Sequence, residues 1–263
     1  NLPPAARDVY HKHAMAAQAW EKSKYTNTGE LMTDVEARKK EKQWVEERMI
    51  DDVERTIMTA YHTNHLEFLP FYFIHVNYLY SRPTAGPNDG EDFIPIEMAI
   101  CRYTIQDGCT ESYHQLMPVK IQMGYASAAK DHSAVTHKLE ALLTGPFRDY
   151  KEIEGDYQVI LEKFMKFLEQ ASAGGKLPPI FTRNNCVEPV KCFFDRLAYQ
   201  MADPQWRGST TLPEIYDIEI LFARLLILCD DSLECYPFVA ARALAEGLLN
   251  SGSYNYAPGI DCY

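Results

Sequence analysis

The sequence lacks several features that define common classes of protein. No uncharged apolar run reaches the roughly 18 residues that a membrane-spanning helix needs, since IYDIEILFARLLILC is interrupted by Asp217, Glu219 and Arg224. The start of the chain does not resemble a signal peptide, and the seven cysteines include no CxxC pair. We therefore expect an intracellular protein in a reducing compartment, with no membrane partner.

Common catalytic motifs are also missing. The sequence contains no HExxH, GxSxG or GxxxxGK[ST], no internal repeat and no low-complexity segment.

The formal charge of the chain is -11, which argues against a protein that coats nucleic acid by bulk electrostatics, although a local basic stripe could still hold a single strand. We expect small core positions for Cys101 and Cys109. Surface or loop positions are expected for His11, His13, His62, His65, His114, His132 and His137.

What the sequence does contain is a glutamate inside an apolar strand. The stretch FIPIEMAICRYTIQDGCTESYHQLM, Phe93 to Met117, predicts two strands joined by a hairpin turn at QDG. Alternation places Ile100 on one face of the first strand and Cys101 on the other, beside Glu97. Because both faces are apolar, we expect a strand inside a sheet with helices above and below. A carboxylate there needs pairing, a hydrogen bond or a metal ion.

The remaining pattern predicts an α/β domain with a mixed sheet flanked by helices. FYFIHVNYLY, which begins at Phe71, is a strand ahead of the glutamate strand, so three antiparallel strands come first. After a loop region near Gly124 to Asp156, helices and strands alternate. The expected elements are a helix at about 157–171, the strand PPIFT, a helix from Val187 to Gln200, the strand EIYDI, a helix to Cys229 and a helix from Phe238 to Leu249. Two further helices form an N-terminal extension.

This order of elements is similar to the ribonuclease H-like fold, in particular to the DEDD-type exonucleases. Within it, IEMAICRYTIQDG, FTRNNCVEPVKCFFDRL, EIYDIEILFARLL and YNYAPGIDCY resemble the Maelstrom domain, a divergent ribonuclease H-like domain known from germline piRNA silencing of transposons. The resemblance implies a Maelstrom domain over residues 68–263, C-terminally incomplete, after a helical connector at 25–67. Residues 1–24 resemble the last helix of an HMG box.

The resemblance also implies a zinc site that includes Glu97 and Cys262. In Maelstrom proteins a glutamate on the second strand joins a Cys-x2-His and a later cysteine in holding structural zinc, so two further ligands are expected beyond Tyr263. From the residues alone another interpretation stays open, in which Glu97 hydrogen-bonds backbone or an arginine and Cys262 is an ordinary loop residue.

The exonuclease acids are not found where the resemblance would put them. His75 and Asn77 stand where the first strand of a DEDD exonuclease carries Asp-x-Glu, and RNNCVEP lacks the aspartate of a later motif. The nearest acid there, Glu188, begins a helix and suits its N-terminal dipole. An exonuclease site is therefore not expected, and catalytic residues stay unassigned.

For function, the resemblance implies a component of piRNA-mediated transposon silencing in the germline and in meiosis, located in cytoplasmic perinuclear granules and in the nucleus. Single-stranded RNA and piRNA-pathway proteins are the expected partners, and DNA would bind through the upstream HMG box. Family members are associated with single-strand RNA endonuclease cleavage, which the DEDD pattern does not explain. Two alternatives stay open: an active metal-dependent 3′–5′ exonuclease, and a pure protein-interaction scaffold.

Overall fold

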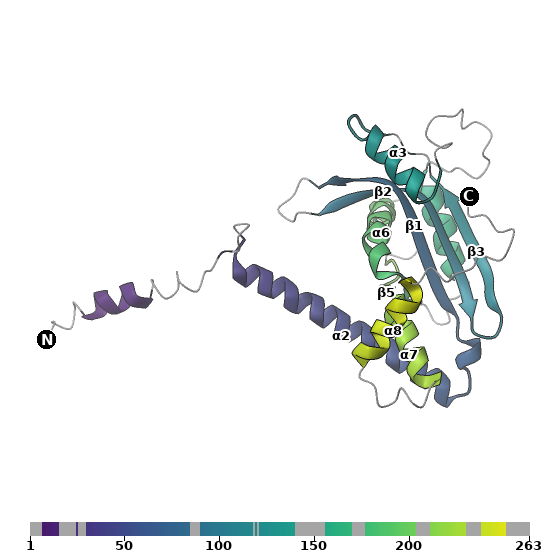
Figure 1. The fold of residues 1–263 in the computed structure, drawn as a ribbon, viewed down its shortest axis with the longest axis horizontal. Coiled ribbons are helices and arrows are strands. Elements are labelled where there is room, and N and C mark those ends of the chain that lie inside the picture. Colours follow the sequence, from purple (N-terminus) through teal and green to yellow (C-terminus); the bar gives the residue numbers. More distant parts are fainter. Residues whose placement is uncertain are drawn as a thin grey trace. The chain divides into compact units, whose positions relative to one another are not determined.

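The centre of the fold is a five-stranded mixed sheet with the strand order β3-β2-β1-β4-β5 (Figure 1). Its strands are β1 (Phe71–Pro83), β2 (Glu91–Thr104), β3 (Gly108–Leu116), β4 (Ile180–Thr182) and β5 (Ile215–Asp217). The first three are antiparallel, whereas β4 and β5 run parallel to β1. This is the order of a ribonuclease H-like sheet, as the sequence predicted. The glutamate strand β2 lies inside it, between β1 and β3.

Backbone contacts divide the chain into two units, residues 1–54 and residues 55–263. The structure is a computed structural model that describes residues 7–15, 25, 30–84, 90–117, 119, 121–139, 156–169, 177–203, 211–229 and 238–250. The first unit contains a helix at 7–15 and the first part of α2 (Met32–His62), which agree with the two predicted N-terminal helices. None of the described helices is both long and apolar enough to span a bilayer.

Two helices, α5 (Tyr157–Glu169) and α6 (Val187–Met201), cover one face of the sheet. Both were predicted from the helical spacing of their apolar residues, and burial of that stripe against alternate residues of the strands stabilises the unit. The buried residues of this layer include Tyr72, Ile74 and Val76 of β1, Met98 and Ile100 of β2, Phe164 and Leu168 of α5, and Phe193 and Leu197 of α6.

At the β5 end of the sheet, the two predicted helices α7 (Ile218–Cys229) and α8 (Phe238–Asn250) pack against one another. The two helices approach closely because small side chains lie between them. Ala223, Ala241 and Ala245 are all buried in this contact.

The middle of the opposite face of β1, β2 and β3 is open in the described part of the structure, whereas Phe71 is buried at one end of this face and a short helix at Ala126–Val135 packs against β1 at the other. Ala99 of β2 is exposed, as are His75 of β1 and His114 of β3. The prediction of helices on both faces therefore fails only for this middle part of the face. Ala99 is flanked there by the polar side chains of His75 and His114, so this part of the surface does not need a covering helix.

A short helix, α3 (Ala126–Val135), lies in the region that was predicted as a loop near Gly124 to Asp156. It follows Gly124, whose φ of 94° suits a residue without a side chain. Ala129 and Ser133 are its buried residues, so the apolar periodicity that identifies a helix is almost missing. Residues 140–155 of the predicted loop lie outside the described residues.

Candidate functional site

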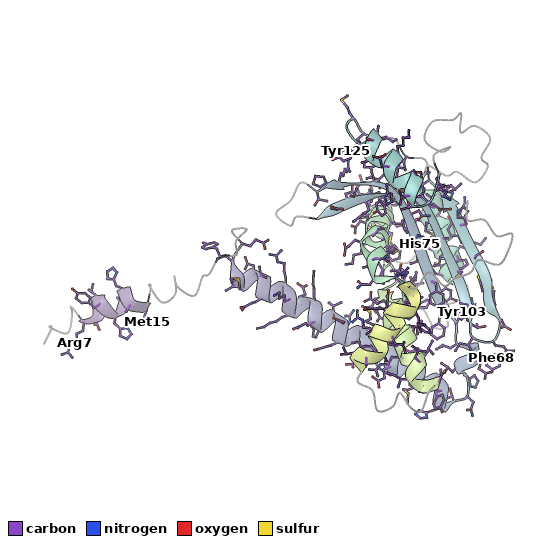
Figure 2. The ribbon with its side chains drawn as sticks, viewed as in Figure 1. Arg7, Met15, Phe68, His75, Tyr103 and Tyr125 are labelled. Carbon is purple, nitrogen blue, oxygen red and sulfur yellow. The ribbon has the colours of Figure 1, made fainter. Side chains whose placement is uncertain are left out.

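Polar side chains form rows across three strands on the open face. The strand register places His75 of β1 opposite Ala99 of β2, and Ala99 opposite His114 of β3. One row further along, Asn77 of β1 lies opposite Glu97 of β2. Figure 2 shows His75 midway along the sheet and Tyr103 nearer its hairpin end. The only side chain between the two histidines is therefore the methyl group of Ala99.

Glu97 is held by one hydrogen bond to each carboxylate oxygen. Asn77 Nδ2 donates to Oε2 over 2.6 Å, and His114 Nε2 donates to Oε1 over 2.7 Å. The Glu97 side chain is 16% exposed, so these bonds replace much of the hydration that the carboxylate loses. The expectation that Glu97 has a partner is met within the chain. The partners are an amide and an imidazole, rather than backbone or an arginine.

The network extends to His75 through the amide of Asn77. His75 Nε2 lies 2.9 Å from Asn77 Oδ1. Because the Asn77 amide nitrogen donates to Glu97, its oxygen must accept, so His75 Nε2 carries the hydrogen. Donors therefore run from His75 to Asn77 to Glu97, and His114 donates to Glu97 from the other side. The network orients both imidazoles on the open face.

A cavity of about 630 Å³, which we name the Glu97 cavity, adjoins this network. It lies between β1, β2, α3 and the short 3-10 helix η3 (Asn184–Cys186). Among the described residues that line it, Glu97 is the one carboxylate. The lining residues are His75, Val76, Asn77, Tyr78, Glu97, Ala99, His132, Thr136, His137, Asn185, Cys186 and Pro189.

Two histidines lie on the α3 side of this cavity. His132, on α3, is half-buried and does not have the surface or loop position predicted for it, whereas His137, in the turn after α3, is in a loop as predicted but is buried. His132 stacks on Tyr78 with 4.2 Å between ring centroids. His137 Nε2 donates to the Tyr78 carbonyl oxygen over 3.2 Å, and its Nδ1 accepts from the Leu139 N–H over 3.2 Å. Burial lowers the pKa of both histidines, so both are neutral at pH 7. No sequence signal marked their contacts with Tyr78, because α3, which carries His132 and directly precedes the turn with His137, was itself not predicted.

The predicted metal ligands were Glu97 and Cys262. Cys262 lies outside the described residues, and among those described no three His, Cys, Asp or Glu side chains are grouped so that they could hold a metal ion. Glu97 is nevertheless compatible with ligation, since each carboxylate oxygen accepts one hydrogen bond and keeps a second lone pair. Carboxylate and thiolate are both donors that zinc accepts. The zinc site stays a prediction.

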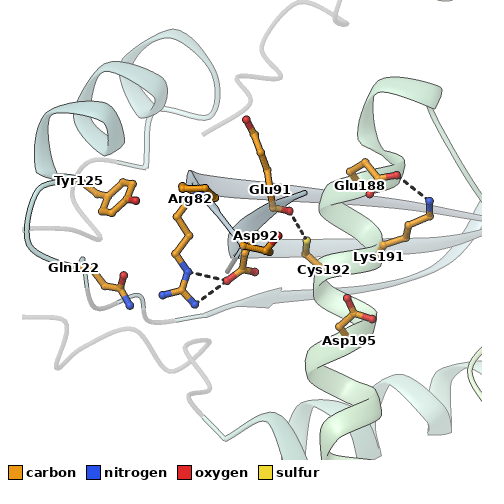
Figure 3. A pocket seen from close by; sticks show the side chains of 11 residues that line it. Arg82, Glu91, Asp92, Gln122, Tyr125, Glu188, Lys191, Cys192 and Asp195 are labelled. Carbon is orange, nitrogen blue, oxygen red and sulfur yellow. Dashed lines mark hydrogen bonds and ion pairs between the residues drawn. The ribbon is translucent and has the colours of Figure 1, made fainter. Parts of the chain in front are cut away.

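A second cavity, of about 710 Å³, lies between the start of β2 and α6 (Figure 3). Asp92 is bound from two sides, by Arg82 Nη2 at 2.8 Å and by Arg196 Nη2 at 2.7 Å. Lys191 pairs with Glu188 at 2.8 Å. The pair of Arg196 with Asp92 joins α6 to β2. Because these charges pair with one another, we take the Glu97 cavity and the open face beside it as the candidate site.

Comparison with known proteins gives matches over most of the chain. The family model described as "Maelstrom: piRNA pathway germ-plasm component" matches residues 89–263. The protein maelstrom homolog of Culex quinquefasciatus is 29% identical over 268 residues, which cover 99% of this chain and 49% of that protein. Protein maelstrom 2 of Drosophila persimilis is 31% identical over 138 residues, which cover 51% of this chain and 30% of that protein. The chain thus spans about half the length of the first relative and less of the second.

Among solved structures, an Exonuclease I from Methylocaldum szegediense is similar over 57% of this chain and 27% of its own chain. The identity is 13% and the TM-score is 0.34.

Proposed function

The chain belongs to the Maelstrom family, and from this premise we propose that it takes part in piRNA-mediated silencing of transposons in the germline. The description of the family as a piRNA pathway germ-plasm component supports this role. In the proposal, residues 68–263 form the Maelstrom domain, 25–67 a helical connector, and 1–24 the end of a DNA-binding HMG box. Partner proteins of the piRNA pathway, and residence in perinuclear granules and the nucleus, belong to the same proposal.

The open sheet face is the surface that we assign to single-stranded RNA. Phe73 and Tyr103 lie side by side on it, with ring centroids 5.7 Å apart and both side chains half-buried. His75, Asn77 and His114 place hydrogen-bonding groups on the same face. Aromatic rings on an open sheet stack with unpaired bases, and neighbouring polar groups bind base edges. This combination of rings and polar groups is the observation that carries the proposal.

The charge of the chain determines which contacts would supply the affinity. A formal charge of -11 gives no bulk attraction for phosphates, so phosphate contacts would have to come from local basic side chains, and we assign most of the affinity to stacking and hydrogen bonds. Binding through this face would therefore weaken only modestly as the salt concentration rises.

Substitution of Tyr103 tests the assignment of RNA to this face. We expect Tyr103→Ala to weaken binding of a labelled single-stranded RNA by about 5- to 150-fold, since stacking on one base contributes roughly 1–3 kcal/mol. Fluorescence anisotropy titration measures this, with a duplex of the same sequence alongside. Tyr199→Ala is the matched control, because Tyr199 is 79% exposed on α6, which covers the other face. A wild-type chain that binds no RNA would instead favour the protein-interaction scaffold.

The proposal leaves out DEDD exonuclease activity. His75 and Asn77 occupy the β1 positions where the resemblance would require acids, and Glu97 is the one carboxylate among the described residues that line the cavity. Two-metal cleavage needs several carboxylates around a pair of ions. We assign no catalytic residues for single-strand RNA cleavage.

A structural zinc ion completes the proposal. Glu97 and Cys262 would hold it together with two ligands that follow Tyr263, and bound zinc would cross-link β2 to the C-terminal part of the domain. The place of Glu97 in the lining of the cavity, with a free lone pair on each oxygen, supports this role. Its hydrogen bonds to Asn77 and His114 would orient the carboxylate for the metal.

A further inference from the structure

Two cysteines lie together on the open face, on neighbouring strands. Cys101 is half-buried on β2, Cys109 is exposed on β3, and both are free thiols. The register places Cys109 opposite Tyr103, and Cys101 is two residues from Tyr103 on the same strand. Side chains two residues apart on a strand share a face, so Cys101, Tyr103 and Cys109 all lie on the same side of the sheet. The expectation that Cys109 is a core residue was wrong, because it stands at the start of an edge strand.

A bulge in β3 brings the two thiols closer together than a regular ladder would. In a regular ladder such diagonal neighbours are about 7–8 Å apart, which is too far for a disulfide. Here the register shifts between Arg102 and Tyr103, so that Thr110 is an extra residue on β3 and Ser112 lies opposite Cys101. The Cys109 thiol donates to the Glu111 carbonyl oxygen over 3.8 Å, across the bulge. The Cys109 side chain is therefore directed along β3 toward the residue opposite Cys101, and the nearby Cys109 thiol is, after burial, a further reason why the pKa of Cys101 is raised.

We propose that Cys101 and Cys109 form an oxidisable dithiol site, which a small disulfide such as oxidised glutathione converts to a Cys101–Cys109 disulfide. The other described cysteines differ from this pair. Cys186 is half-buried on η3, with its thiol donating to Asn185 Oδ1, and Cys192 is buried on α6, with its thiol donating to the Glu91 carbonyl oxygen. Cys229 is exposed, but it lies on α7 at the β5 edge, whereas β3 forms the opposite edge. The inference rests on neither RNA binding nor zinc.

The chemistry is a two-step thiol–disulfide exchange. The Cys109 thiolate attacks one sulfur of oxidised glutathione, breaks its S–S bond and expels one glutathione thiolate. Cys101 then attacks the Cys109 sulfur of the mixed disulfide and expels the second glutathione thiolate. The protein loses two electrons and two protons, and oxidised glutathione gains both to become two molecules of reduced glutathione.

Exposure decides the order of the two steps. Cys109 is accessible to glutathione, whereas burial raises the pKa of Cys101 to about 11 and keeps that thiol protonated at neutral pH. The second step still proceeds because it is intramolecular, with the attacking sulfur held beside its target. A disulfide at this place would join β2 to β3 directly beside Tyr103.

Peptide mapping tests the site. Trypsin cuts after Arg102, between the two cysteines, so the disulfide joins two peptides that otherwise separate. The peptide 103–120 contains Cys109 as its only cysteine, and the peptide that ends at Arg102 contains only Cys101. After the chain is incubated with oxidised glutathione, we expect the linked peptide pair in the wild type and in the Cys229→Ser control. Reduction should separate the pair.

The single variants distinguish the two steps. Cys101→Ser should lose the linked pair completely and accumulate glutathione on Cys109, whereas Cys109→Ser should lose the pair and leave Cys101 mostly unmodified. Cys101→Ala, a second variant at the same position, should give the same result as Cys101→Ser. Thermal melting of each variant shows whether it folds. If the wild type and Cys101→Ser both accumulate glutathione on Cys109 equally, with no linked pair, the two thiols do not act together and the inference is overturned.

Discussion

At the scale of single residues, Glu97 shows how a strand can hold a carboxylate without a lysine or arginine beside it. Asn77 and His114 come from the two neighbouring strands, and each donates to a different oxygen. Hydrogen bonds to a charged acceptor are stronger than those between neutral groups, so two of them offset the partial desolvation of this side chain. The same contacts orient His75 and His114, and one carboxylate thereby organises a polar patch.

Asn77 is the residue whose loss should reveal the strength of this network. Asn77→Ala removes a donor to Glu97 and the acceptor of His75, and we expect the free energy of unfolding to fall by about 1.5–3 kcal/mol. Urea unfolding followed by circular dichroism gives this value. A double-mutant cycle with Glu97→Gln isolates the coupling between the two side chains. Strictly additive losses would mean that Asn77 and Glu97 do not stabilise one another.

At the scale of secondary-structure elements, β1 and β2 divide their residues between two different surfaces. Val76 and Met98 are buried beneath α5 and α6, whereas His75 and Ala99, their neighbours in sequence, are exposed. The covered face stabilises the sheet by removing apolar area from water. The open face contributes less to stability and is the surface that can bind a ligand.

Paired phenylalanine substitutions compare the two faces directly. Phe164→Ala removes a fully buried ring from α5 and should lower the free energy of unfolding by about 3–5 kcal/mol. Phe73→Ala, on the open face, should cost clearly less because the ring is only half-buried. Urea unfolding of both variants makes the comparison. Equal losses would show that the open face is covered in solution, which would remove the surface proposed for RNA.

At the scale of the whole molecule, β1 is the strand that joins the two halves of the sheet. It pairs with β2 on one side and with β4 on the other, although β2, β3, α3 and α5 separate β1 from β4 in sequence. The family match begins at residue 89, after β1. Without β1 the sheet would split between β2 and β4, so we keep the proposed domain boundary at residue 68.

The zinc prediction also belongs to this scale, because its ligands lie 165 positions apart, at 97 and 262. In a longer form of the protein that continues past Tyr263, we expect one zinc ion per chain. Its removal by a chelator should lower the melting temperature, since a structural zinc ion stabilises only the folded state.

Metal analysis and melting before and after chelation measure both effects. Cys262→Ser should abolish zinc binding, whereas Cys229→Ser, the matched control, should retain it. A metal-free domain whose melting does not change on chelation would contradict the zinc site. The carboxylate of Glu97 would then be stabilised by its hydrogen bonds from Asn77 and His114 and not by a metal ion.

The elements of this protein follow from its sequence, because each depends on residues close together in the chain. Period-two alternation and the QDG turn predicted β2 and β3, and apolar residues at helical spacing predicted α5 and α6. The cost of burying a carboxylate predicted that Glu97 has a partner. The helix α3 was missed because an alanine- and serine-rich segment carries almost no periodic signal.

The tertiary structure alone decided which groups surround the site. Asn77 and His114 meet Glu97 only because of the register of three strands, and His132 reaches Tyr78 only because α3 lies against β1. The open middle of one sheet face, and the position of Cys109 across a bulge from Cys101, arise in the same way. Strand register and helix position are set by many weak contacts between distant segments, so neither can be predicted from a single stretch of sequence.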